Sequence, residues 1–167
     1  QKGAMILQGF LAGLFAREIP LSFTCSITFE QNYGGVEGDS ASLAEAVAVI
    51  SDLAGLPVRQ DVAITGSMNQ RGEAQIVGGV AHKVEGFFRA CTDKPAGLTG
   101  TQGAIVPNTN ARSLVVEGDL VDAVAAGRFH LSSAASPPGS AVSMRPLPPP
   151  SADRGMSRVG TVKYRGV

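Results

Sequence analysis

Residues 57–91, PVRQDVAITGSMNQRGEAQIVGGVAHKVEGFFRAC, contain the pattern that decides the fold. We expect a strand over Val62–Gly66, and the turn at Asn69–Gly72 then returns the chain into Ala74–Val77 as a hairpin. A pair of glycines follows and opens a helix over Val80–Cys91. Strand, hairpin and helix in succession indicate a fold that mixes helices with a sheet.

The segment before this pattern adds two helices and a strand. Apolar residues with the spacing of one helical face predict helices over Ala4–Arg17 and Ser40–Leu53. Between them, apolar and hydroxyl side chains alternate from Leu21 to Phe29, which predicts a strand with one buried face. Cys25 lies on the apolar side of this strand, so we expect it to pack in the core.

The segment after the pattern continues the alternation of strands and helices. A short apolar strand is expected over Gly103–Val106 and ends at Pro107. A helix over Glu117–Ala126 and a final strand over Phe129–Leu131 follow. The predicted class is therefore α+β, or mixed α/β.

Composition divides the chain at about residue 131. The chain has 167 residues, is 44% hydrophobic and 17% charged, and has no net charge, which suits a globular domain. Residues 132–167 contain six of the ten prolines and a charge of +4, which leaves −4 on residues 1–131. We therefore expect one domain over 1–131 and a Ser/Pro-rich basic tail over 132–167 that is disordered.

Composition also argues against several functions. A net charge of zero gives no reason to expect nucleic acid as a partner. The longest apolar stretch, 4–16, is too short to span a membrane. Two His and two Cys offer no metal site, and no phosphate-binding glycine loop with Lys-Ser/Thr is present. The sparse cysteines favour a reducing, cytoplasmic environment. The chain starts with Gln1 and enters a helix almost at once, which suggests a fragment of a longer protein.

The first candidate for chemistry is Ser40, in the loop GDSAS at 38–42. A serine at the start of a helix lies near free backbone N–H groups, which can hold an oxyanion. The alternative is helix capping by Asp39 or Ser40, with Ser42 and Glu45 forming a capping box. The pentapeptide alone favours capping.

The second candidate is Lys83, in the first turn of the helix that follows Gly78-Gly79. The helix dipole and apolar neighbours there would favour a neutral amine, which can act as a general base for a serine. Thr65 could orient the amine, whereas Glu37 or Asp39 close by would favour the charged form. The alternative is an ordinary solvated helix lysine.

A third arrangement is a Ser–Asp–His triad of Ser40, Asp119 or Asp122, and His130. The chain order is that of α/β-hydrolases. However, residue 42 is serine rather than the glycine of a nucleophile elbow, and the chain is short for that fold. This triad remains the competing catalytic hypothesis.

Several ordered segments resemble the proteolytic domain of Lon proteases, in the form typical of the archaeal, Lon-B-like branch. The resemblance covers about residues 3–131, and the segments that carry it are Gly35–Ser42, Pro57–Ser67, Arg71–Glu73, Val77–Lys83 and Gly103–Pro107 with Asn110. Ser40 and Lys83 are 43 residues apart, as the catalytic dyad of that family would require.

The resemblance implies a serine endopeptidase that cleaves peptide bonds through an acyl-enzyme. Ser40 would be the nucleophile and Lys83 the general base. Thr65 would help to orient the amine, Glu37 and Asp39 would flank the nucleophile, and backbone N–H groups near Ser40 would bind the oxyanion.

The resemblance also implies partners. Family members join this domain to an ATPase that unfolds damaged proteins, usually in a homo-oligomeric, hexameric ring. The chain itself would use no cofactor, and the ATPase would be supplied upstream in the same chain or by another one. Relative to the family, this sequence lacks the first strands and ends in the Ser/Pro-rich tail. A non-catalytic oligomerisation module of the same fold therefore remains an alternative.

Overall fold

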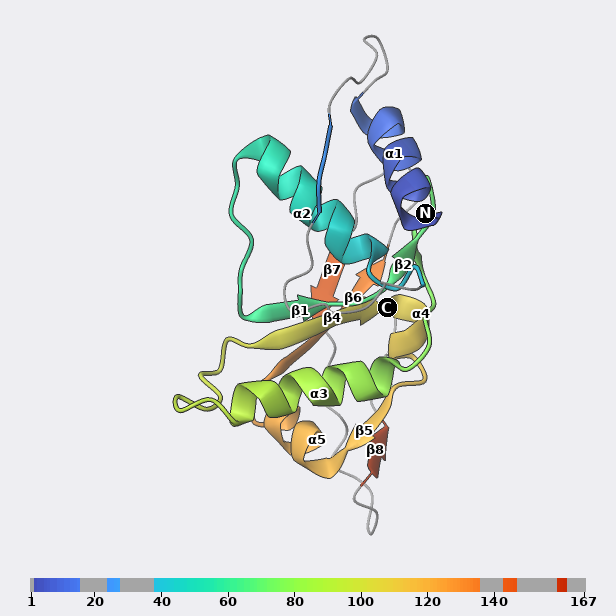
Figure 1. Ribbon diagram of the computed structural model, residues 1–167. Helices are drawn as coiled ribbons and strands as arrows, with labels where there is room; N and C mark the ends of the chain where they lie inside the picture. Colours follow the sequence, from blue (N-terminus) through green and yellow to red (C-terminus); the bar gives the residue numbers. More distant parts are fainter. Residues whose placement is uncertain (1, 16–23, 28–37, 136–142, 147–158, 162–167) are drawn as a thin grey trace.

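The computed structural model describes residues 2–15, 24–27, 38–135, 143–146 and 159–161 (Figure 1). Its helices are α1 (Lys2–Phe15), α2 (Ser42–Ala54), α3 (Val80–Thr92), α4 (Asn108–Ala111) and α5 (Gly118–Ala125). Its strands are β1 (Val62–Ile64), β2 (Ser67–Met68), β3 (Ala74–Gln75), β4 (Gly103–Pro107), β5 (Val115–Glu117), β6 (His130–Ala135), β7 (Ser143–Pro146) and β8 (Val159–Thr161).

A four-stranded sheet in the order β1-β4-β6-β7 forms the centre of the molecule. The neighbours β1, β4 and β6 are parallel, and β7 joins β6 antiparallel. Gly103, the first residue of β4, lies close to β6. A Cβ at this position would be 2.5 Å from the backbone oxygen of His130, so a side chain here would clash. Two smaller antiparallel pairs, β2–β3 and β5–β8, flank the main sheet.

Two hydrophobic cores cover the two faces of the sheet. α1 and α2 lie on one face, and α3 and α5 lie on the other (Figure 1). Side chains of β4 point alternately to each face, so Ala104 and Val106 join the core under α3 and α5 while Ile105 packs with α1 and α2. Both layers are therefore fixed to the same strands. Among the described residues, no helix has the length and apolarity needed to cross a membrane.

The predicted mixture of helices and strands is confirmed, and the differences are mainly in element boundaries. The strand expected over Val62–Gly66 ends at Ile64, and β2–β3 form the hairpin instead. The reason lies at Gly66, whose backbone bonds to the loop of Ser40 rather than to β4. The Gly66 N–H donates to the Ser40 carbonyl at 2.9 Å and is not available to extend the sheet. Sequence reasoning did not predict β5 and α4.

The strand expected over Leu21–Phe29 is wrong in the part that the structure describes. Residues 24–27 form no strand and are exposed, and Cys25 is exposed rather than packed in the core. An alternating pattern becomes a half-buried strand only where a neighbouring strand and an apolar layer are available. Residues 24–27 pair with no described strand and are exposed, so both conditions are unmet in the described part of the chain.

The final strand continues beyond the expected domain boundary. β6 runs to Ala135 instead of ending at Leu131, and it pairs with β7. β8 pairs with β5. Residues 132–135, 143–146 and 159–161 thus contribute strands, and the rest of the predicted tail lies outside the described residues.

Replacing Gly66 with alanine should destabilise the fold. An added Cβ would lie 2.4 Å from Cδ1 of Leu43 and 3.0 Å from Cγ of Pro107. We expect Gly66→Ala to lower the free energy of unfolding by about 1–3 kcal/mol, as overpacking of a core does. Denaturant unfolding would measure it. Gly78→Ala is the matched control, because nothing lies within 4 Å of its Cβ position, and an equal loss in both variants would contradict the packing argument.

The two cysteines should differ in reactivity. Cys25 is exposed, whereas Cys91 is buried and its burial raises the pKa of its thiol. We expect a thiol reagent to modify one cysteine rapidly in the native chain and the second after denaturation. Cys25→Ser should abolish the rapid phase. Protection of Cys25 in the native chain would instead support the buried strand.

Candidate active site

The side chains of Ser40 and Lys83 meet in the folded chain. The Nζ atom of Lys83 donates a hydrogen bond to the Oγ atom of Ser40 at 2.9 Å. Ser40 lies just before α2, and Lys83 lies in the first turns of α3, so the two residues come from helices on opposite faces of the sheet (Figure 1). They meet beyond the carboxyl ends of β1 and β4, the usual edge for sites in parallel sheets.

Backbone groups that follow β1 hold the loop that contains Ser40. The Ser40 carbonyl accepts a hydrogen bond from the Gly66 N–H at 2.9 Å, and the Leu43 N–H donates to the Gly66 carbonyl at 3.2 Å. The preceding residue, Thr65, donates its own N–H to Ile105 on β4 at 3.1 Å. The position of Ser40 is therefore tied directly to the parallel pair β1–β4.

Thr65 lies at the site, but on the side of the serine. Its hydroxyl donates to the Ser40 carbonyl at 3.4 Å, a long hydrogen bond. Within the described part of the chain it forms no hydrogen bond with the Lys83 amine that it was expected to orient. The other predicted flanking residue, Glu37, lies outside the described residues.

Asp39 contacts the start of α1 rather than Lys83. Its carboxylate forms an ion pair with Lys2 at 2.7 Å. The Lys2 ammonium holds the pKa of Asp39 below its ordinary value of 3.8. The Ser67 Oγ atom is fully buried and forms no hydrogen bond with the described residues. Sequence reasoning did not single out Ser67, because a serine at the start of a two-residue strand carries no motif.

The predicted capping box is not formed. Ala41 is the N-cap of α2 and has no side-chain capping bond, and Ser42 lies inside the helix. The buried Ser42 hydroxyl donates to the Asp39 carbonyl at 2.7 Å, which closes the turn around Ser40. The backbone N–H groups of Ser40 and Ala41 form no hydrogen bond with any described residue. They resemble the free donors that were expected at this junction.

Lys83 reaches Ser40 along the surface of the domain. Its helix α3 begins at Val80, and the N-cap residue Gly79 has a φ of 65° and supplies no side-chain cap. Val80 and Val84 on the same helix are buried in the core, whereas the Lys83 side chain is exposed. The burial that we expected around the amine is therefore not supplied by the residues that the structure describes.

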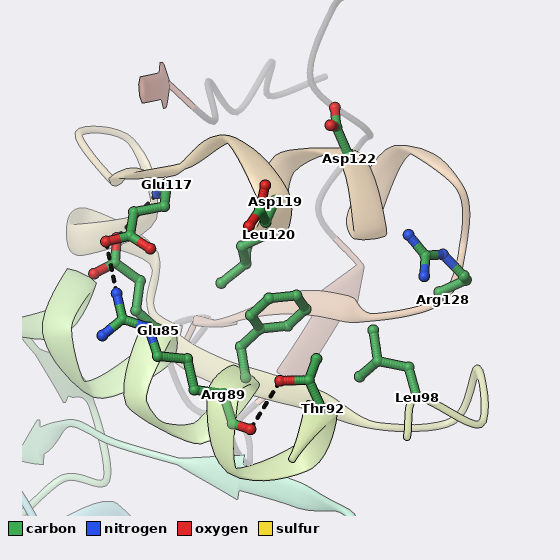
Figure 2. A pocket seen from close by; sticks show the side chains of 10 residues that line it. Glu85, Arg89, Thr92, Leu98, Glu117, Asp119, Leu120, Asp122 and Arg128 are labelled. Carbon is green, nitrogen blue, oxygen red and sulfur yellow. Dashed lines mark hydrogen bonds and ion pairs between the residues drawn. The ribbon is translucent and has the colours of Figure 1, made fainter. Parts of the chain in front are cut away.

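The residues of the alternative triad do not gather around Ser40. His130 is on β6, and its Nε2 atom contacts the Gly100 carbonyl at 2.8 Å. Asp119 and Asp122 line a cavity of about 390 Å³ between α3 and α5 (Figure 2). None of these three residues contacts Ser40.

Both apolar and charged side chains line this cavity, and Phe88, Leu98 and Leu120 are its apolar members. Arg89 forms an ion pair with Glu117 at 2.6 Å (Figure 2). The Glu117 N–H also donates to the carboxylate of a second acid, Glu85. No cluster of three or more metal-ligating side chains was found in the described segments.

Comparison with known proteins supports the resemblance carried by these segments. The sequence model of the Lon protease (S16) C-terminal proteolytic domain matches residues 33–120, about half of the chain. A putative Lon protease homolog of Escherichia coli (strain K12) is 51% identical over 128 residues, 77% of this chain and 22% of that protein. The archaeal Lon protease of Pyrococcus abyssi is 38% identical over 134 residues, 71% of this chain and 12% of that protein.

These matches identify the chain as a domain of a peptidase family. More narrowly, the chain belongs to the family of Lon protease C-terminal proteolytic domains, and its relatives include both a bacterial Lon homolog and archaeal Lon proteases. The chain spans about a fifth or less of the length of these curated relatives.

The pKa of Asp39 should depend on Lys2. Lys2→Met removes the main cause of the lowered value, so the pKa of Asp39 should rise toward 3.8, as a carboxyl NMR titration would show. A carboxyl with a depressed pKa stabilises the fold above its unfolded-state pKa, and this stabilisation is lost as the pH falls through the folded-state value. Because the pair is exposed, we expect a loss of less than about 1 kcal/mol at pH 7.

Lys94→Met is the control, since it removes the same charge from another exposed position. If both variants shift the Asp39 titration equally, the ion pair with Lys2 is not the cause.

Proposed function

We propose that this chain hydrolyses peptide bonds as the proteolytic part of a Lon-type protease, with Ser40 as nucleophile and Lys83 as general base. The observation that carries the proposal is the 2.9 Å hydrogen bond between the Lys83 amine and the Ser40 hydroxyl. A base within hydrogen-bond reach of a hydroxyl is the first requirement for activating it. Membership of a protease family supports the same reading.

In the proposed reaction, the uncharged Lys83 amine accepts the hydroxyl proton while Ser40 Oγ bonds to the substrate carbonyl carbon. The tetrahedral intermediate then expels the amine half of the substrate, which takes the proton from Lys83, and leaves an ester on Ser40. A water molecule attacks this ester with Lys83 again as base, which releases the acid half and restores the hydroxyl. The backbone N–H groups of Ser40 and Ala41 are the proposed oxyanion donors.

The base must be uncharged to accept a proton, and the described residues leave Lys83 exposed. We propose that the substrate supplies the missing cover. A polypeptide lying across Ser40 would exclude water from the amine, and desolvation disfavours a charged ammonium. In this reading, substrate binding and activation of the base are coupled.

The supporting residues have distinct proposed roles. Thr65, through the Ser40 carbonyl, positions the nucleophile loop, and its proposed orienting effect on Lys83 acts through that loop. Asp39, held by Lys2, anchors the same loop from the other side. Glu37 is proposed to flank the nucleophile.

The activity of the whole protein is a further proposal, because the chain covers about a fifth or less of its relatives. We propose that it acts in the cytoplasm on unfolded or damaged proteins, as part of a homo-oligomeric ring. An ATPase, joined upstream or supplied by another chain, would use ATP to deliver the substrate.

Removing either member of the pair should abolish activity. We expect Ser40→Ala and Lys83→Met each to lower cleavage of a fluorogenic peptide by at least about a thousandfold, because nucleophile and base act as a unit. Lys83→Met keeps the apolar stem and removes the amine. Ser113→Ala and Lys94→Met are matched controls at exposed positions and should leave the rate unchanged.

His130→Ala separates the two catalytic hypotheses. It should have no effect on a Ser–Lys dyad and should be fatal to a Ser–Asp–His triad. Full activity in Lys83→Met would exclude the dyad. Failure of a fluorophosphonate to label Ser40 in the wild-type chain would favour the non-catalytic module.

A further inference from the structure

Asn110 on α4 forms two hydrogen bonds with the backbone just before α3, the helix that carries Lys83. Its Oδ1 atom accepts a hydrogen bond from the Val77 N–H at 3.0 Å, and its Nδ2 atom donates to the Val77 carbonyl at 2.9 Å. Asn110 is half-buried, so water competes weakly for these bonds. Two bonds to one residue fix the position and the orientation of that backbone more firmly than one bond would.

The side chain of Val77 packs against the core, but the residues that follow it have little to fix their backbone. Val77 is followed by Gly78 and Gly79, two residues with wide conformational freedom, and α3 begins at Val80 without a side-chain cap. A Cβ at either glycine would meet nothing within 4 Å, so neighbouring atoms do not restrict this link. Asn110 therefore supplies a directional restraint on a backbone segment that its two glycines leave free to move.

The core contacts of α3 do not replace this restraint. Val80 and Val84 are buried and hold the helix against the sheet. Apolar packing is not directional, however, and allows small shifts along the helix axis that a pair of short hydrogen bonds does not. Lys83 donates its own N–H to the Gly79 carbonyl at 3.1 Å, so a shift at Gly79 is passed on to Lys83.

Asn110 also connects the two halves of the site. It follows β4, while the Ser40 loop is held by residues that follow β1, and β1 and β4 are neighbouring parallel strands. The distance between Ser40 and Lys83 is thus set by one rigid pair of strands, with one anchor for each reacting group.

We infer that Asn110 is a positioning residue for the Lys83 amine: by holding Val77, it sets the place from which the amine reaches Ser40. This inference rests on the proposed Ser–Lys dyad. Asn110 does not touch the reacting atoms, so its effect must pass entirely through Lys83.

A double-variant cycle tests this dependence. The readout is the rate at which a fluorophosphonate labels Ser40 in the 167-residue chain, followed by mass spectrometry. We expect Asn110→Ala to slow labelling at least about tenfold in the wild-type background and to have no effect in the Lys83→Met background. Asn110→Asp keeps the acceptor for the Val77 N–H and loses the donor, so its rate should be intermediate. Thr109→Ala, an exposed change on the same helix, should match the wild type.

The outcomes separate this inference from the proposed function. An equal slowing by Asn110→Ala in both backgrounds would show a general structural effect and would overturn the positioning role, as would no slowing in either background. If Lys83→Met labels at the wild-type rate, the dyad itself fails, and the inference fails with it. Should Asn110→Ala not fold, as shown by its unfolding curve, Asn110→Asp carries the same comparison.

Discussion

The parallel pairing of β1 with β4 is the constraint on which the rest of the structure depends. β4 contributes side chains to both hydrophobic cores, and β1 contributes Ile64 to one of them. The residues that follow these strands hold the loop of Ser40 and the backbone before α3. The backbone hydrogen bonds of this pair are therefore shared by the core and the site. A distortion of the pair would loosen the layers and separate Ser40 from Lys83 together.

The elements with a clear local signal could be predicted from the sequence. The helical spacing around Leu43 placed α2 and the glycine pair before Val80 placed α3 to within a few residues, and Gly103–Val106 was predicted as a short apolar strand. The partnership of Ser40 and Lys83 also came from the sequence, because the segments around them resemble one family in order and spacing. Their hydrogen bond shows that the two residues are neighbours in the fold.

The remaining features depend on contacts that no local pattern encodes. Residues 24–27 have the alternating pattern of a strand, yet they pair with no strand that the structure describes. Ser42 stands where a capping residue is expected, but Ala41 is the N-cap, so Ser42 lies inside α2. The two hydrogen bonds between Asn110 and Val77 join residues 33 positions apart, and they form because the fold brings α4 beside that segment. The exposure of Lys83 likewise depends on tertiary contacts, because no element in the described part of the chain covers it.

The arrival of Ser40 and Lys83 from helices on opposite faces of the sheet has a consequence for the newly made chain. If only one layer has packed on the sheet, one of the two residues is not held beside the other. The pair therefore exists only where both layers are packed on β1 and β4. A partly folded chain would lack the pair and, with it, the proposed activity.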